Sequence, residues 1–254
     1  MKYFSGQPMP SNVAEALKLV GKVGFITRDL WRDFFATGNS RWNREHIRLL
    51  SERHLLEQHP NPIAKNCFVA SRFARILLAK HSLHYGPAPY VSQLVHDEII
   101  VRSLLRLSRE NLIYDWRVEN EMKSIQMRQH QLNSSAKDQK YPDAVFKLSA
   151  LNRQRLCAME YERTRKSPQR YRDILWLYSK MDSLWMVLFV CETETIHSMI
   201  KRQLHRLGQP LLNNRVAFTN AELWKKSPGS APIELADKSF TLNQLCSVSE
   251  NIAA

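Results

Sequence analysis

The chain has 254 residues, of which 44% are hydrophobic, so it can bury a substantial core, and its length suits one large domain or two small ones. Its formal net charge is +13 at pH 7 and its pI is about 9.8, which is too basic for an ordinary enzyme of small metabolites. The charge indicates a polyanionic partner, either nucleic acid or an anionic membrane surface.

Residues 11 to 80 predict three short helices, a strand pair and a fourth helix. The first three helices are expected over 11–19, 27–35 and 41–53, and each of the first two begins at a Ser or Thr that can cap it. The segments 55–59 and 66–70 flank a Pro-Asn-Pro turn and resemble a hairpin. Three helices followed by a hairpin predict a winged helix-turn-helix domain.

The third predicted helix carries a basic stripe. Arg41, Arg44 and Arg48 share one face at spacings of three and four, while Trp42 and Leu49 lie on the other side. A recognition helix needs this pattern to pack inward and to meet phosphates outward, so we expect these arginines to contact DNA. The alternative is a solvated basic surface on a domain that binds a protein.

The best candidate for a linker is the segment His84-Tyr85-Gly86-Pro87-Ala88-Pro89, and we expect a winged-helix domain over 1–86, a second domain over 87–224 and a C-terminal tail over 225–254. The second domain opens with a helix whose apolar stripe contains Asp97. An acid in such a stripe is costly without a partner, so we expect Asp97 to face a functional site.

The second domain alternates between strands and helices, which predicts a mixed α/β (α+β) fold with helices on both sides of the sheet. A continuously apolar run near its end is typical of a strand that is covered on both faces. The strands are expected over 112–118, 143–148, 156–163 and 185–191 with a short one near Val216, and the helices over 91–108, 168–181 and 193–206.

Three acids stand out in this domain. Asp143 follows a proline that suits the first residue of a strand, and Glu160 and Glu162 project from one face of the next strand because side chains alternate. Three converging carboxylates repel one another unless a hard cation such as Mg²⁺ or Mn²⁺ lies among them. The pattern indicates metal-assisted phosphodiester cleavage; the plainer interpretation is a turn acid and two solvated glutamates.

These acids resemble the PD-(D/E)xK nuclease signature, with glutamate in place of the final lysine. The segments Tyr141-Pro142-Asp143-Ala144, Glu160-Tyr161-Glu162-Arg163-Thr164-Arg165-Lys166-Ser167, Arg170-Tyr171 and Val187-Leu188-Phe189-Val190 together look like the replication-relaxation family, which includes MobC-type relaxases of mobilizable plasmids. The resemblance spans about residues 20–220, and its specific part is the central block.

The resemblance implies a winged helix followed by a restriction-endonuclease-like mixed sheet. It also implies an endonuclease (relaxase) that nicks one DNA strand at a plasmid transfer origin, with Mg²⁺ or Mn²⁺ and with an accessory relaxosome or coupling protein as partner. By motif match Asp143 and Glu160 would hold the metal. Glu162 would bind metal or accept a proton, and Lys166 would supply the missing positive charge or be an ordinary basic residue.

The basic run Arg163, Arg165 and Arg170 lies beside the acids and is a further DNA-contacting surface. Most relaxases use a tyrosine nucleophile beside a histidine cluster, but the chain has no His-x-His. Tyr161 should point away from the two glutamates, and Tyr171 lies on an apolar helix stripe. We therefore expect water to be the nucleophile.

A second class of function fits the same architecture: a plasmid-encoded DNA-binding protein that acts in replication, regulation or relaxosome assembly without cutting. A structural protein of unrelated mixed fold would leave the charge unexplained. The four cysteines lack C-x-x-C spacing, so a zinc or redox site is not expected. The longest apolar segment is far shorter than the ~20 residues of a membrane helix, and we expect a cytoplasmic protein.

Overall fold

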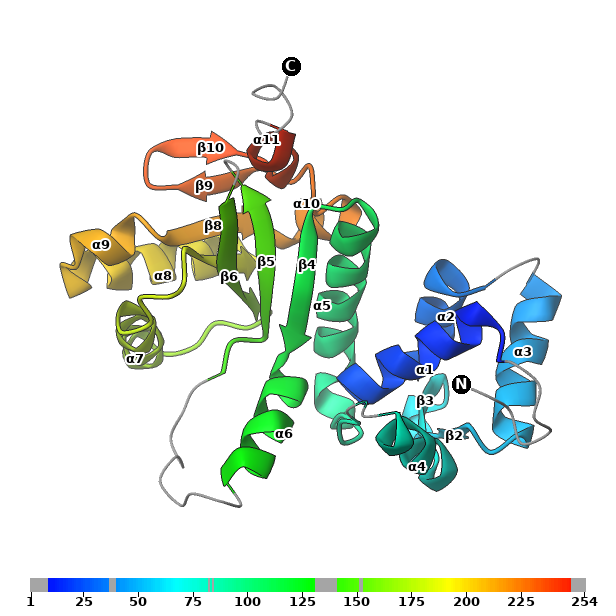
Figure 1. The fold of residues 1–254 in the computed structure, drawn as a ribbon. Helices are drawn as coiled ribbons and strands as arrows, with labels where there is room; N and C mark the ends of the chain where they lie inside the picture. The colour runs from blue at the N-terminus through cyan, green and yellow to red at the C-terminus, as the bar shows by residue number, and fades with distance from the viewer. Residues whose placement is uncertain are drawn as a thin grey trace. The chain divides into compact units, whose positions relative to one another are not determined.

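The structure is a computed structural model that describes residues 9–36, 40–81, 83, 85–130, 141–150 and 153–247, without the side chains of 40–45 and 126–130 (Figure 1). The chain divides into two compact units. Unit 1 comprises Met1–Val101 and Asn120–Ser134, and unit 2 comprises Arg102–Glu119 and Ser135–Ala254. The predicted mixed α/β class is confirmed, with a small antiparallel sheet in unit 1 and a larger mixed sheet in unit 2.

Unit 1 contains the predicted helices and hairpin, together with a short first strand that the sequence did not indicate. The strands form a sheet in the order β1-β3-β2, and both pairs are antiparallel. The elements are α1 (Ser11–Val23), β1 (Ile26–Thr27), α2 (Arg28–Phe34), α3 (Ser40–Glu52), β2 (Leu56–Gln58), the 3-10 helix η1 (Pro62–Ala64), β3 (Cys67–Ala70) and α4 (Arg72–Lys80).

Local chemistry fixes the ends of these helices. Thr27 caps α2 as predicted, because its hydroxyl accepts a hydrogen bond from Leu30 N at 3.1 Å, whereas Pro10 and not Ser11 precedes α1. Gly24 ends α1 at a φ of +93°, and a Cβ there would lie 2.1 Å from the carbonyl oxygen of Pro87. Only glycine fits this position.

Two helices contribute to both units: α5 (Val91–Arg109) and α6 (Glu119–His130). None of the helices in the described ranges is long and apolar enough to cross a membrane.

Unit 2 contains the predicted strands and helices and several elements that the sequence did not indicate. The unpredicted ones lie mostly after Trp224, within the residues that were predicted to form a tail. The elements are β4 (Ile113–Val118), β5 (Ala144–Ala150), β6 (Arg153–Glu162), α7 (Pro168–Ser179), β7 (Met186–Cys191), α8 (Glu194–Leu207), α9 (Pro210–Asn213), β8 (Val216–Asn220), α10 (Ala221–Lys226), β9 (Ile233–Leu235), β10 (Lys238–Phe240) and α11 (Leu242–Ser247).

The seven strands of unit 2 lie in the order β10-β9-β8-β7-β6-β5-β4. Strands β4, β5 and β6 are antiparallel, β6, β7 and β8 are parallel, and β9 and β10 return antiparallel. The parallel strands are joined by α7 and α8, as parallel neighbours require. All six residues of β7 are buried, as its apolar sequence predicted.

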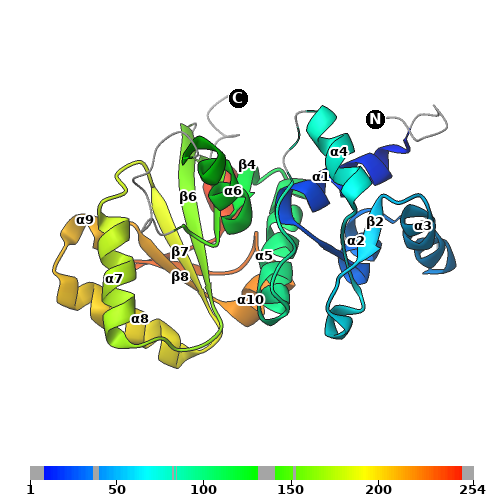
Figure 2. The ribbon, with the colours of Figure 1, turned by 90° about the horizontal axis from the view of Figure 1, so that it is seen from below.

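Helices cover both faces of this sheet. Figure 2 shows α7 and α8 on one face, and α10 with the adjoining part of α5 on the other. Between α7, α8 and the sheet lies a continuous core that includes Ile174, Phe189, Ile200 and Phe218. Glu160 and Glu162 stand on this same face of β6, because they alternate with Met159 and Tyr161.

Candidate acidic site and basic loop

Two glutamates are buried at the carboxyl end of β6. Glu160 is 2% exposed and Glu162 is 1% exposed, and each accepts a hydrogen bond from a tyrosine on the inner face of α7. Tyr161 lies between them and points to the opposite face, where its hydroxyl donates to Glu192. The predicted alternation along this strand is therefore confirmed.

Asp143 stands immediately before β5, beside these glutamates. Ala144 pairs with Met159, so one further step in the same register places Asp143 opposite Glu160. The backbone N–H of Tyr161 donates to Asp143 Oδ2 at 2.7 Å. The sequence thus correctly predicted that these acids come from neighbouring strands.

Tyr178 of α7 contacts the acidic site through its hydroxyl. It is 1% exposed and donates a hydrogen bond to Glu160 Oε1. Burial raises the pKa of Tyr178 well above its usual value, and the negative charges of Glu160, Asp143 and Glu162 raise it further. Tyr178 therefore remains a neutral donor to Glu160.

Glu162 is held by a different set of donors. Lys166 Nζ lies 2.5 Å from Glu162 Oε1, and the hydroxyl of Tyr171 lies 3.4 Å from Glu162 Oε2. Burial is the largest cause that raises the pKa of Tyr171 to about 12, and the negative charge of Glu162 also raises it. Tyr171 is buried, as predicted for a core residue, but its hydroxyl also serves the site.

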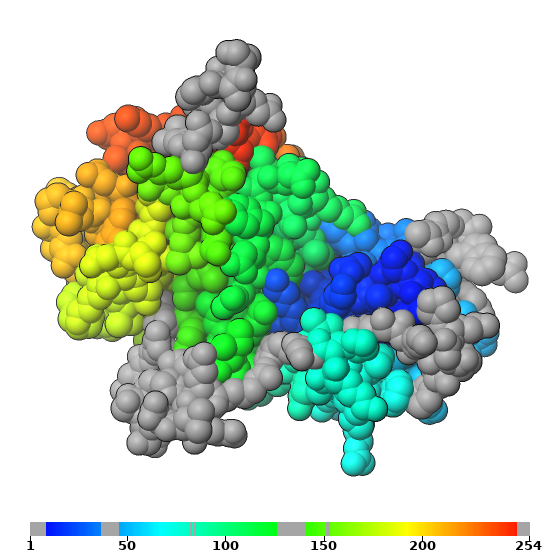
Figure 3. Space-filling model, in the orientation of Figure 1, coloured from blue at the N-terminus to red at the C-terminus, as the bar shows by residue number. Residues whose placement is uncertain are grey.

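The loop from β6 to α7 is basic and exposed. Arg163, Arg165 and Arg170 are all exposed, and Ser167 caps α7 by accepting a hydrogen bond from Arg170 N at 3.2 Å. Figure 3 shows α7, in yellow-green, at the molecular surface. Positive side chains therefore lie within a few residues of the buried acids in the chain.

The other predicted site residues belong to unit 1. Asp97 lies on α5, where its Oδ1 is 3.0 Å from Nδ1 of His96, so the acid in the apolar stripe has a local partner. Arg48 is exposed on α3 and its guanidinium lies 3.4 Å from Glu52. The side chains of Arg41 and Arg44 fall outside the described part of α3.

Two polar groups near β6 were not predicted from the sequence. Glu192 accepts a hydrogen bond from the Tyr161 hydroxyl, and Lys225 Nζ lies 3.4 Å from both oxygens of Glu192. Burial and the hydrogen bond to Glu192 raise the pKa of Tyr161 above its ordinary range. The hydroxyl of a buried tyrosine needs a hydrogen-bond partner. In the sequence, Tyr161 on a predicted strand was therefore the signal that a polar group lies nearby.

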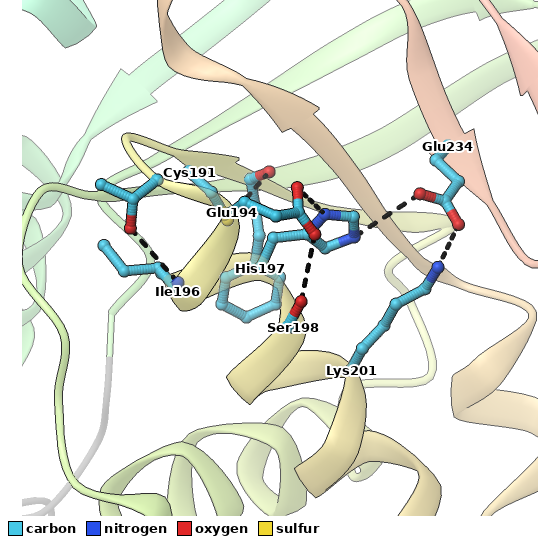
Figure 4. Close-up of polar contacts among 9 residues, drawn as sticks. Cys191, Glu194, Ile196, His197, Ser198, Lys201 and Glu234 are labelled. Atoms are coloured by element: carbon cyan, nitrogen blue, oxygen red, sulfur yellow. Dashed lines mark hydrogen bonds and ion pairs between the residues drawn. The ribbon is translucent and has the colours of Figure 1, made fainter.

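A separate cavity of about 410 Å³ lies near the carboxyl ends of β7 and β8. Figure 4 shows its polar wall, in which His197 of α8 lies between two carboxylates. His197 Nδ1 is 3.4 Å from Glu194, and Nε2 is 3.5 Å from Glu234, which also pairs with Lys201. The imidazole packs on Phe218 with 4.6 Å between ring centroids. These contacts tie β9 to α8.

The acids of unit 2 suit a metal ion only in part. Across the described ranges, no group of three or more His, Cys, Asp and Glu side chains is arranged to hold a metal ion. Mg²⁺, however, is commonly held by one or two carboxylates plus substrate phosphates and water. Asp143 and Glu160 are the two carboxylates that such a site would use, and each already accepts a hydrogen bond, from Tyr161 N and from the Tyr178 hydroxyl respectively. Both oxygens of Glu162 lie against Lys166 and Tyr171.

Comparison with known proteins gives no match for this chain among family models, curated proteins or solved structures.

Proposed function

We propose that the protein is a metal-dependent DNA endonuclease that nicks one strand at a plasmid transfer origin, as its resemblance to the replication-relaxation family implies. The observation that carries this proposal is the pair of buried glutamates on β6, with Asp143 opposite Glu160, followed at once by the exposed basic loop. Buried acids beside an exposed basic surface are typical of catalytic sites.

The topology supports the same proposal. Apart from α6, which is inserted between β4 and β5, the chain order runs from helix α5 through the antiparallel strands β4, β5 and β6 and helix α7 to the parallel strand β7. This is the order expected of a restriction-endonuclease-like core. In unit 1, three helices and the β2–β3 hairpin agree with a winged helix-turn-helix.

The proposal gives the acids and the arginines separate roles. Asp143 and Glu160 would hold Mg²⁺ or Mn²⁺, which when bound supplies Lewis acidity and lowers the pKa of a water. The arginines of the basic loop would bind the DNA phosphates, as guanidinium groups do. Water is the nucleophile in this proposal, because Tyr161 is 2% exposed and hydrogen-bonded to Glu192.

The decisive experiment uses supercoiled plasmid that carries its own transfer origin. Purified protein is incubated with it, with and without Mg²⁺ or Mn²⁺, and open circles are measured. We expect nicking that EDTA stops and that Asp143→Ala or Glu160→Gln abolishes, while DNA binding is retained because the arginines provide it. Glu234→Gln is the matched control, since it removes an acid that pairs with Lys201. Equal nicking by an Asp143→Ala/Glu160→Ala double variant would contradict the metal assignment.

A second function is favoured by one observation: in the part of the chain that the structure describes, three metal-holding side chains do not converge. Under this alternative the protein binds DNA in replication, regulation or relaxosome assembly without cutting it. Fluorescence anisotropy with origin DNA distinguishes the two. Tight, EDTA-insensitive binding by a protein that never produces open circles would favour the non-catalytic function.

A further inference from the structure

We infer that Glu162 is a positioning residue that holds Lys166 over the site, so that the two together replace the single lysine expected at position 162. This inference rests on the proposed nuclease function. It assigns Glu162 neither to the metal nor to proton transfer.

The contacts fix the direction of the pair. Lys166 Nζ is 2.5 Å from Glu162 Oε1, yet the side chain of Glu162 is 1% exposed while that of Lys166 is 38% exposed. Glu162 is therefore the buried member of the pair, and Lys166 is the partly exposed one. An ammonium has three donors, so after one is used by Glu162 two remain for a phosphate oxygen or a water.

Tyr171 stabilises this arrangement. Its hydroxyl accepts a hydrogen bond from Lys166 N at 3.2 Å and lies 3.4 Å from Glu162 Oε2, and its ring centroid is 6.0 Å from Lys166 Nζ. Lys166 is thus fixed at both its backbone and its side chain. A side chain locked in this way is what a catalytic cation requires, since a mobile lysine would lose entropy when it binds.

Charge and spacing agree with this role. A buried carboxylate is costly without a partner, and Lys166 supplies one from the loop after β6. Glu160 and Glu162 are two positions apart on one face of β6, so their Cα atoms are separated by roughly 7 Å. The Glu162–Lys166 pair therefore lies one strand repeat along β6 from the proposed metal ligand Glu160.

The test moves the lysine along the chain. We expect Lys166→Ala to lower kcat for nicking by about 100-fold, the typical loss when one transition-state donor is removed, with the Mn²⁺ concentration at half-maximal rate unchanged. Lys166→Arg should keep most of the rate. The double variant Glu162→Lys/Lys166→Ala should recover to within about tenfold of wild type, because the cation returns to the motif position. Lys180→Ala is the control, an exposed lysine packed over Trp176.

Each other outcome is decisive. Wild-type nicking by Lys166→Ala, or a folded double variant no more active than Lys166→Ala, would overturn the inference. A rise in the Mn²⁺ requirement of Glu162→Gln would assign Glu162 to the metal instead. If the double variant does not fold, full activity of Glu162→Gln would overturn the inference, and partial loss matched by Lys166→Ala would uphold it. Absence of nicking by the wild-type protein would overturn the proposed function, and this inference with it.

Discussion

Tyr178 illustrates how a single side chain can organise the acidic site. The sequence predicted it only as part of the apolar face of α7, and it is indeed 1% exposed. Its hydroxyl, however, donates to Glu160. A hydroxyl buried against a carboxylate stabilises the fold, because bulk water cannot replace it as a hydrogen-bond donor when it is removed. It also orients that carboxylate.

We predict that Tyr178→Phe weakens Mn²⁺ binding by about 10- to 100-fold, the usual effect of removing a group that orients a metal ligand. The same change should lower the free energy of unfolding by about 1–3 kcal/mol, since Glu160 loses a buried donor. Calorimetric Mn²⁺ titration and urea denaturation measure the two effects. Tyr90→Phe, at a tyrosine that is 83% exposed, is the matched control. Unchanged Mn²⁺ affinity in Tyr178→Phe would remove the orienting role.

At the scale of elements, the long strands and helices were predictable, and the hairpin of β9 and β10 was not. Each of those strands has only three residues, and Ala236 between them adopts a φ of +51°. Hairpin turns with positive φ usually contain Asn or Gly, so the sequence carried no turn signal there. The hairpin forms because β8 offers an edge for β9 to pair with.

Deletion of residues 225–254 should therefore destabilise unit 2. The deletion removes the partner of β8 and the fully buried side chains of Ile233 and Leu242, and it leaves an apolar edge exposed. We expect aggregation in size-exclusion chromatography and loss of a cooperative urea transition. A control truncated after Ser247 retains all described elements and should behave as the full chain. A soluble, cooperatively unfolding deletion variant would show that β9 and β10 are dispensable.

The basic helix α3 provides a second prediction at this scale. Each phosphate neutralised by a cation contributes about 0.9 to the slope of log affinity against log salt concentration. Replacing Arg41, Arg44 and Arg48 by alanine should flatten that slope by about two to three units and leave Mn²⁺ binding by unit 2 intact. Lys80→Ala on α4 is the control. An unchanged slope would move the DNA surface to the loop of Arg163, Arg165 and Arg170.

For the whole molecule, the sequence showed which residues share a strand face. It did not show which side chains of other elements contact that face. Alternation along β6 placed Glu160 and Glu162 together, because the side-chain period of a strand is two. The donors Tyr171 and Tyr178 depend on how α7 packs over β6, which is a tertiary property. Asp97 was predicted to face the site only because it interrupts an apolar stripe. In the structure its partner is the adjacent residue, His96.

The buried thiols predict how stability depends on pH. Burial is the main cause that raises the pKa of Cys67 and of Cys191 from 9.0 to about 12, and it raises that of Cys157 as well. Above pH 9 the unfolded chain releases these protons while the folded chain keeps them, so the free energy of unfolding falls as pH rises. This contribution is complete below pH 9 and is lost towards pH 12.

Urea denaturation at pH 7.5, 9 and 10.5 measures this loss. A Cys67→Ala/Cys191→Ala variant should lose less stability between pH 9 and 10.5 than the wild type, because two of the linked protons are absent. Identical pH profiles for the two proteins would assign alkaline destabilisation to other groups.

The seven strands of unit 2 lie in the sheet in the same order as in the chain, from β4 to β10. During ribosomal synthesis each emerging strand therefore meets an edge that its predecessor has already formed, and no strand waits for a partner that is made later. Such local pairing shortens the search for native contacts. The growing edge stays open until β9 and β10 leave the ribosome, so nascent chains stalled before residue 233 are the ones that should need a chaperone.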